Sequence, residues 1–281
     1  MTFKLSCELD YTAQSPLSFL LNIRVQENSC QQVVSEQFSL VPQMPHVQHR
    51  DPVTGNRFDQ IDAQMPGIYH IRYEATVENS PALLTRENLA ETPVQDFNLD
   101  VLSYLYASRY CQSDRLINLA AQQFAGCATP LERVQAVLEW IREHISYVSG
   151  STNSSTSAVD TLVERRGVCR DFAHLGIAMC RAMNIPARYF TGYAHDLNPP
   201  DFHACLETWI GGRWLLWDAT GLASPDAIVR IGTGRDAAEV SVCTSFGSLK
   251  LERQNVACQS ANEGYSKLDP ERLTRMFVSH G

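Results

Sequence analysis

The order of strand-like and helix-like segments predicts an α+β protein, in which strands and helices occupy separate stretches of the chain. Residues 1–85 contain short runs of β-branched and aromatic residues bounded by turn formers, which is the pattern of strands. Residues 100–183 change to helical spacing, and residues 185–244 return to strands. A length of 281 residues leaves room for one large domain or two modest ones.

Residues 1–85 predict a small antiparallel β domain with a sandwich-like alternation of strands and turns. Stretches that contain Pro, Gly and Asn separate the apolar runs and predict turns. The last run, residues 68–77, is the richest in β-branched and aromatic side chains. The expected strands are 3–11, 17–26, 33–40 and 68–77.

Helical spacing begins after Pro81 and is clearest in the segment that follows Thr129. Thr129 at the N-cap, Pro130 at the first helical position and Glu132 at the third combine a capping box with a helix-starting proline. The apolar residues after Pro130 recur at the spacing of a buried helical stripe. The expected helices are 100–110, 114–124, one from 130 onward, 158–166 ending at Gly167, 168–183 and 269–277.

Strands return in the last third of the chain. The polar stretch 149–157, composed almost entirely of Ser, Thr, Asn and Gly, predicts an exposed loop before them. Gly211-Gly212 predicts a tight hairpin between two of the strands. We assign residues 95–258 to a second domain and 259–281 to a C-terminal tail. The expected strands are 185–193, 203–210, 214–219, 229–231 and 239–244.

The composition argues against nucleic-acid and membrane partners. Lys and Arg total 23 and Asp and Glu total 31, a formal net charge of −8 that repels phosphates. No apolar run reaches the roughly 18–20 residues that cross a bilayer, and the N-terminus lacks the apolar stretch of a signal peptide. The nine cysteines are too sparse for a disulfide scaffold. We therefore expect reduced thiols and a cytoplasmic location.

Cys169 is the cysteine whose position predicts chemistry. It follows Gly167 at the start of a predicted helix, where partial positive charge and free backbone N–H groups stabilise a thiolate and a developing oxyanion. Cys180, beside methionines in the same helix, fits the packing role that most cysteines have. A nucleophilic thiol also needs a base and a residue that orients the base.

The predicted hairpin supplies both partners. Positions equidistant from the Gly211-Gly212 turn face one another in an antiparallel pair, so residue 220 would lie opposite His203. Asp218 is then one diagonal step from His203 on the same face. We expect Asp218 to set the tautomer of His203 while the other ring nitrogen meets the Cys169 thiol.

Four motifs follow one another over residues 95–250: GVCRDFAHL at 167–175, IPARYFTGY at 185–193, HA at 203–204 and WLLWDAT at 214–220. Together they resemble the transglutaminase-like superfamily in its bacterial branch, which includes cysteine proteases and whose usual N-terminal domain resembles the β domain here. The resemblance implies a papain-like α+β fold in which the cysteine-bearing helix packs on an antiparallel sheet. It also implies Cys169 as the nucleophile, His203 as the general base and acid, and Asp218 as the orienting residue.

Two positions depart from the family's pattern. Where the family shows His-Ala-Trp, this chain has His203-Ala204-Cys205, and Cys205 shares a strand face with His203. Its thiol is expected to replace Trp in the packing, with an inhibitory disulfide to Cys169 or a shared metal as the alternatives. Papain-like enzymes place a Gln six residues before the nucleophile and animal transglutaminases a Trp, and that position is Val163 here. Tyr147 is the candidate for the second oxyanion donor.

Other motifs predict no cofactor or metal. Asp171 and His174, on the same predicted helix as Cys169, are interpreted as structural because Asp171 suits the helix dipole and His174 points to a different face. No C-x-x-C, H-x-x-x-H or EF-hand spacing is present.

The sequence therefore predicts cysteine-dependent acyl transfer on a peptide or protein amide through a thioester intermediate, resolved most simply by water. Resolution by a primary amine, as in a transglutaminase, and a non-catalytic binding or scaffold module that retains the fold are the alternatives. No oligomeric state is predicted.

Overall fold

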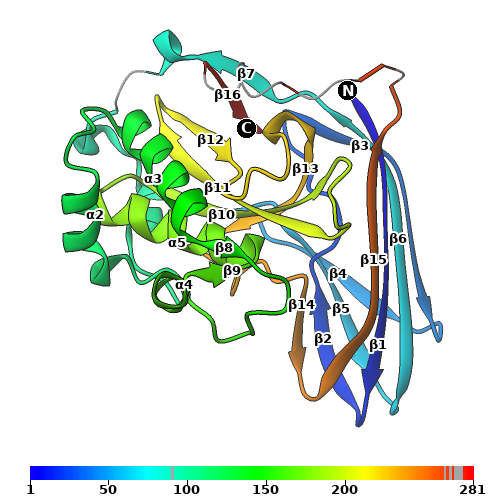
Figure 1. Ribbon diagram of the computed structural model, residues 1–281. Helices are drawn as coiled ribbons and strands as arrows, with labels where there is room; N and C mark the ends of the chain where they lie inside the picture. Colours follow the sequence, from blue (N-terminus) through cyan, green and yellow to red (C-terminus); the bar gives the residue numbers. More distant parts are fainter. Residues whose placement is uncertain (90–91, 263, 266–267, 269–274) are drawn as a thin grey trace.

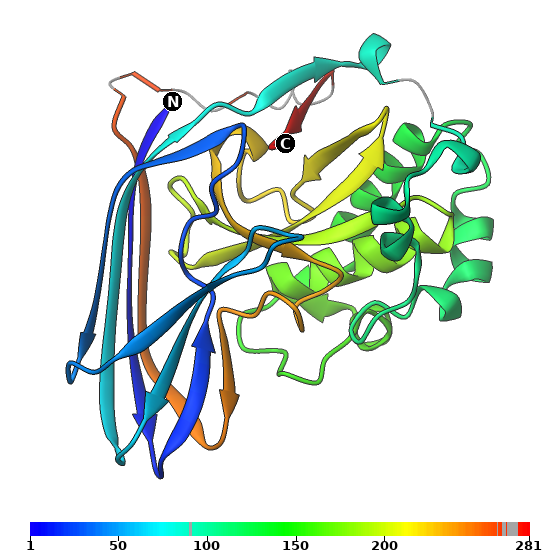
Figure 2. The same cartoon turned by 180° about the vertical axis from the view of Figure 1, so that it is seen from behind.

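In the computed structural model, a β-sandwich lies beside a helix-covered six-stranded sheet (Figure 1). The structure describes the whole chain except residues 90–91, 263, 266–267 and 269–274. Seen from behind, the long strands of the sandwich stand on one side of the six-stranded sheet and the helices on the other (Figure 2). The predicted α+β class with antiparallel sheets is confirmed.

The sandwich consists of two four-stranded antiparallel sheets. Side chains alternate between the buried and the solvent-facing side along its strands, as expected for sheets with one wet face. The first sheet runs β15 (Leu249–Ser260), β1 (Thr2–Ala13), β6 (Gly67–Asn79) and β3 (Gln31–Val41). The second runs β14 (Cys243–Phe246), β2 (Leu17–Leu21), β5 (Arg57–Ala63) and β4 (His46–Arg50).

Three sandwich strands, β4, β5 and β15, were not predicted from the sequence, and one predicted strand is shorter. Every residue of β4 is exposed, so this edge strand has no apolar face to recognise. In β5 the inward positions include Arg57 and Asp59, which are buried through ion pairs rather than as apolar side chains. The predicted strand 17–26 ends at Leu21. Residues 243–258, expected in the second domain, and 259–260, expected in the tail, lie in strands that pair with β1 and β2; the predicted domain limits stay a prediction.

The six-stranded sheet carries the predicted hairpin at its centre. Gly211 and Gly212 have φ values of 64° and 72°, the left-handed conformation that a tight hairpin turn requires. Met276 and Phe277 belong to a strand rather than to the predicted helix 269–277, the rest of which lies outside the described residues except Arg275. The sheet order is β13 (Ile228–Gly234), β10 (Ala187–Ala194), β11 (Phe202–Ile210), β12 (Arg213–Trp217), β16 (Met276–Ser279) and β7 (Ala82–Thr85).

The helices cover one face of this sheet, with α5 at the centre of the core (Figure 1). The capping box predicted at Thr129 is present. The predicted helix 100–110 is a single turn, because the chain after it wraps the buried Arg181 guanidinium, which donates to Tyr106 O and Ser108 Oγ at 3.0 Å. The helices are α1 (Leu99–Leu102), α2 (Ile117–Gln123), α3 (Pro130–His144), α4 (Ala158–Glu164) and α5 (Cys169–Ala182).

Short elements complete the chain. The last residue of α4 is Glu164, and Arg165 caps the helix in the left-handed conformation with φ 58°. The helix predicted over 158–166 therefore ends two residues earlier than expected. The parallel pair is β8 (Ser146–Tyr147) and β9 (Arg166–Gly167). Single 3-10 turns lie at η1 (Arg86–Asn88), η2 (Val94–Asp96), η3 (Ser103–Leu105), η4 (Ser113–Arg115) and η5 (Pro225–Ala227). Across the described part of the chain, no helix has both the length and the apolar character to span a membrane.

The sandwich closes the free edge of the sheet with buried side-chain amides. Gln31 accepts from Arg230 N at 2.7 Å and donates to Arg230 O at 2.9 Å. Asn56 makes the same pair of bonds to Thr233, at 3.0 and 2.8 Å, and Asn79 donates to the carbonyl of β13 at its first residue. These amides take the place of a neighbouring strand, since buried backbone groups need partners.

Candidate active site

Cys169 is the first residue of α5, and its neighbours make the helix begin there. The Asp171 carboxylate accepts a hydrogen bond from Val168 N at 2.9 Å and thereby caps the helix. Gly167 permits this approach, because a Cβ at that position would lie 2.7 Å from Asp171 Cβ. The first N–H groups of a helix have no partner within it, so donors are available beside the thiol.

His203 and Asp218 meet as the hairpin register predicts. Leu206 pairs with Trp217, and the same register continued along β11 would place residue 220 opposite His203. His203 Nε2 lies 3.0 Å from Asp218 Oδ2, off the direction of the ring N–H, so the contact is an ion pair rather than an aligned hydrogen bond. Both side chains are almost completely buried.

The electrostatics of the pair favour a charged imidazolium facing a charged carboxylate. Burial alone lowers the pKa of His203, but the Asp218 carboxylate and the Cys205 and Cys169 thiols outweigh it and hold this pKa well above its usual range. Burial alone raises the pKa of Asp218, but His203, Thr220 and the Ala223 backbone lower it to about 2. The Cys169 thiol is also among the groups that raise the pKa of His203, so it lies near the ring.

A pocket of about 270 Å³ opens beside these groups. The Cys169 thiol is half-buried, as access by a substrate requires. The walls come from the loop after β8, the start of α5 and the segment before β11. Among its lining residues are Tyr147, Thr152, Cys169, Asp201, Phe202 and His203.

Tyr147 lies at the wall of this pocket because β8 pairs with β9, which places it opposite Gly167. Burial raises the pKa of the Tyr147 phenol, and the Cys169 thiol and backbone N–H are next among the groups that act on it. Its hydroxyl is therefore close to the nucleophile, where an oxyanion donor is needed, and that role stays a prediction. Val163 is 74 % exposed on α4 and is not among the residues that line the pocket.

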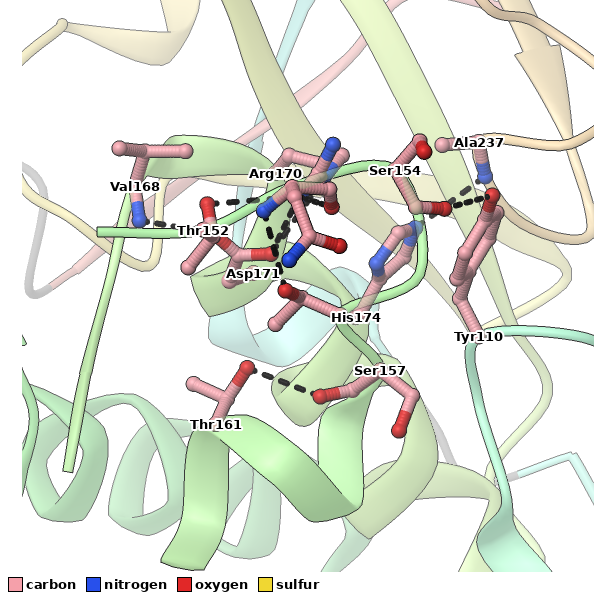
Figure 3. Close-up of polar contacts among 12 residues, drawn as sticks. Tyr110, Thr152, Ser154, Ser157, Thr161, Val168, Arg170, Asp171, His174 and Ala237 are labelled. Atoms are coloured by element: carbon pink, nitrogen blue, oxygen red, sulfur yellow. Dashed lines mark hydrogen bonds and ion pairs between the residues drawn. The ribbon is translucent and has the colours of Figure 1, made fainter. Parts of the chain in front are cut away.

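A clamp that the sequence did not reveal holds the polar loop 149–157 against the first turn of α5 (Figure 3). Thr152 donates to Asp171 Oδ2 at 2.8 Å, while Arg170 donates to Asn153 O at 2.7 Å and to Asp171 Oδ1 at 3.0 Å. We call Thr152, Arg170 and Asp171 the loop clamp. Asp171 thus joins the helix start that carries Cys169 to one wall of the pocket.

His174 lies apart from the pocket. Its ring stacks on Tyr110 at 5.0 Å, and Nε2 accepts from Ala237 N at 3.2 Å (Figure 3). Burial lowers the pKa of His174 to about 3, so the ring is neutral. The structure gives it the packing surroundings expected from the sequence.

Comparisons with known proteins agree with the sequence resemblance. Residues 117–219 match the family model of the transglutaminase-like superfamily, and residues 1–100 match that of the bacterial transglutaminase N-terminal domain. A solved structure of a candidate cysteine protease from Cytophaga hutchinsonii is 40% identical with a TM-score of 0.96, and the match covers 100% of this chain and 98% of that one.

Curated relatives match over shorter stretches. An uncharacterized protein of Mycobacterium leprae is 29% identical over 174 residues, which is 59% of this chain and 61% of that protein. An uncharacterized protein of Mycobacterium tuberculosis is 34% identical over 143 residues, 46% of either chain. The chain thus spans less than two thirds of these relatives. The near-complete match to the Cytophaga structure shows that this chain belongs to the transglutaminase-like superfamily.

Proposed function

We propose that this protein is a cysteine-dependent acyl-transfer enzyme that hydrolyses amide bonds in peptides or proteins. The observation that carries the proposal is the position of His203, which touches Asp218 on one side and interacts with the Cys169 thiol on the other, at the wall of an open pocket. This arrangement supplies a nucleophile, a proton carrier and an orienting carboxylate.

In the proposed reaction the Cys169 thiolate attacks the amide carbonyl, and the Cys169 N–H and the Tyr147 hydroxyl bind the oxyanion. The C–N bond breaks as the His203 imidazolium gives its proton to the departing amine. A thioester remains on Cys169. His203, now neutral, takes a proton from water, whose oxygen attacks the thioester; the C–S bond breaks, the carboxylic acid leaves, and the Cys169 thiolate and His203 imidazolium are restored.

Hydrolysis is proposed over amine transfer because the solved relative that matches the whole chain is a candidate cysteine protease. A transglutaminase reaction would share the first half of the mechanism and differ only in the group that resolves the thioester. The two are separated by adding a dansylated primary amine to a casein digest. Incorporation of the amine above the level of hydrolysis would make transamidation the main activity.

The proposal is tested with Cys169→Ala and with Cys127→Ala as the matched control, since both thiols are half-buried and free. Iodoacetamide near neutral pH should label Cys169 faster than an unactivated thiol. Cys169→Ala should abolish hydrolysis of the casein digest, while Cys127→Ala should keep it. Equal labelling rates for the two thiols, together with unchanged hydrolysis in Cys169→Ala, would leave only a binding or scaffold role.

A further inference from the structure

Behind His203, three side chains of metal-binding type converge. A ring nitrogen of His203, a carboxylate oxygen of Asp218 and the thiol of Cys205 all lie within 4.8 Å of one another, and Nε2 is the ring nitrogen that faces Asp218 Oδ2, at 3.0 Å. We propose that these three groups form a Zn²⁺ site, and that the bound ion inhibits the triad by coordinating Nε2 of His203. The proposed inhibition rests on the proposed function, whereas the metal site itself does not.

The separations suit zinc. Zn–N and Zn–O bonds of about 2.0–2.2 Å and Zn–S bonds of about 2.3 Å place neighbouring ligand atoms of a tetrahedron roughly 3.3–3.7 Å apart. His203 Nε2 and Asp218 Oδ2 are 3.0 Å apart and must move apart by a few tenths of an ångström to hold the ion, while the Cys205 thiol, within 4.8 Å of both residues, closes on it. Neither Cys205 nor Asp218 is among the residues that line the pocket.

The histidine is free to act as a ligand. His203 is 1% exposed, and Nε2 makes no aligned hydrogen bond. Among the residues that the structure describes, Nε2 has the off-axis ion pair to Asp218 and no hydrogen-bond partner. A buried ring nitrogen without an aligned hydrogen bond costs free energy. A metal ion that replaces the proton on Nε2 removes this cost by bonding to the nitrogen.

The other two ligands are held in place by their surroundings. Asp218 Oδ1 accepts from Thr220 N at 2.8 Å and Thr220 Oγ1 at 2.6 Å, and Oδ2 accepts from Ala223 N at 2.8 Å. Such outer hydrogen bonds orient the carboxylate of a metal site. Cys205 is fully buried in a small apolar cluster with Phe190 and Leu216 that limits access by competing water.

The charges balance when the ion binds. Zn²⁺ displaces the Nε2 proton of His203 and the thiol proton of Cys205, and both protons pass to solvent. The thiolate and the Asp218 carboxylate then neutralise the ion, so no net charge is left in the buried cluster. Burial raises the pKa of the Cys205 thiol to about 12, which keeps it protonated until a metal replaces the proton.

Zn²⁺ bound at Nε2 blocks the proton transfers on which the proposed reaction depends. The ring keeps a single proton on Nδ1 and has no site for the second proton that makes it an imidazolium. It therefore neither takes the proton of the Cys169 thiol nor delivers one to the departing amine. The Cys169 thiol itself is not a ligand.

Binding is tested with the reduced, full-length protein and ZnCl₂ by isothermal titration calorimetry. The wild type and Cys169→Ala should each bind one equivalent, and Cys205→Ala and Cys205→Val should lose affinity at least tenfold. Cys180→Ala, which removes a buried thiol on α5, should bind like the wild type. Co²⁺ provides a second readout, since its thiolate charge-transfer absorption should appear in Cys169→Ala and vanish in both Cys205 variants.

Inhibition is measured for each active variant as the ratio of hydrolysis with and without Zn²⁺. The ratio should fall at least tenfold in the wild type and stay near one in Cys205→Ala. Zinc that binds Cys205→Ala normally, or fails to bind Cys169→Ala, overturns the site, because the ion then sits on the nucleophile. If Cys169→Ala retains hydrolysis, the proposed function fails, while its Zn²⁺ and Co²⁺ binding still decides the metal site.

Discussion

At the scale of single residues, the Asp218 carboxylate is oriented by neighbours in its own loop, independently of His203. Its two oxygens accept hydrogen bonds from Thr220 and from the Ala223 backbone, all within a few residues of Asp218. The carboxylate is thus oriented by its own loop. The charge it presents to His203 holds the pKa of the imidazole high, which keeps a proton ready for a leaving amine at neutral pH.

Replacing the carboxylate should move the alkaline limit of activity. Asp218→Asn removes the main charge that raises the pKa of His203, so the ring loses its proton at lower pH. We expect the alkaline limb of kcat/KM to shift to lower pH and kcat to fall by roughly 10²–10⁴, the usual contribution of acid–base catalysis. Asp226→Asn is the control, a buried acid that binds Tyr265 instead. An alkaline limb that stays in place contradicts the assigned pair.

At the scale of elements, the loop clamp couples loop 149–157 to α5. Thr152→Val keeps the size of the side chain and removes the hydroxyl that donates to Asp171. One lost hydrogen bond of about 1 kcal/mol should raise amide hydrogen exchange in the loop by roughly fivefold. It should also raise KM, because the loop forms a pocket wall.

Ser155→Ala is the control for the clamp, since its hydroxyl bonds only within the loop, to Asn153. It should leave KM unchanged. Equal exchange rates in Thr152→Val and the wild type would show that the loop is held by other contacts.

The start of α5 depends on a close approach at Gly167. Gly167→Ala forces its Cβ against Asp171 Cβ, which lies 2.7 Å away, in a site where both backbones are fixed. We expect the free energy of unfolding in urea to fall by about 1–3 kcal/mol, the usual effect of overpacking. Gly126→Ala is the matched control, because nothing lies within 4 Å of the added Cβ and its φ is not positive. Equal stabilities of the two variants would refute the steric argument.

At the scale of the whole molecule, side-chain amides join the sandwich to the six-stranded sheet. Gln31→Met keeps the length of the side chain but leaves the buried N–H of Arg230 without its acceptor, while the Arg230 C=O keeps the hydrogen bond from Gln26 N. The free energy of unfolding should drop by about 1–3 kcal/mol, the cost of unpaired buried groups. Gln32→Met, on the exposed face of the same strand, should change it little. A similar loss in both variants would mean that strand β3, rather than the amide, is affected.

Buried neutral histidines should make the fold sensitive to mild acid. Burial lowers the pKa of His174 to about 3 and that of His280 to about 4. Between pH 6.5 and 5 the unfolded chain therefore binds protons that the folded chain does not, so stability falls as the pH falls. Each histidine should contribute up to about 1.4 kcal/mol per pH unit.

The histidine prediction is measured by urea unfolding at several pH values. His280→Gln should reduce the slope of stability against pH, and His49→Gln, an exposed histidine on β4, should leave it unchanged. A slope that His280→Gln does not alter would assign the acid sensitivity to other groups.

Local patterns were enough to predict the parts of the candidate site that depend on neighbouring residues. Gly167 and the residues after it predict a helix that begins at Cys169, and the Gly211-Gly212 turn predicts the register of β11 and β12. From that register follows the meeting of His203 and Asp218. A helix start and a two-residue turn are set by interactions over a few residues, so the sequence contains all that they need.

Contacts between distant segments were decided only by the tertiary structure. The loop clamp and the pairing of Gln31 with Arg230 join residues whose separation in the chain carries no local signal. The sequence alone determined the class of fold and the local geometry around Cys169. The partners that buried polar groups find across the molecule were decided by packing, because burial obliges each such group to bond to whatever the fold brings near it.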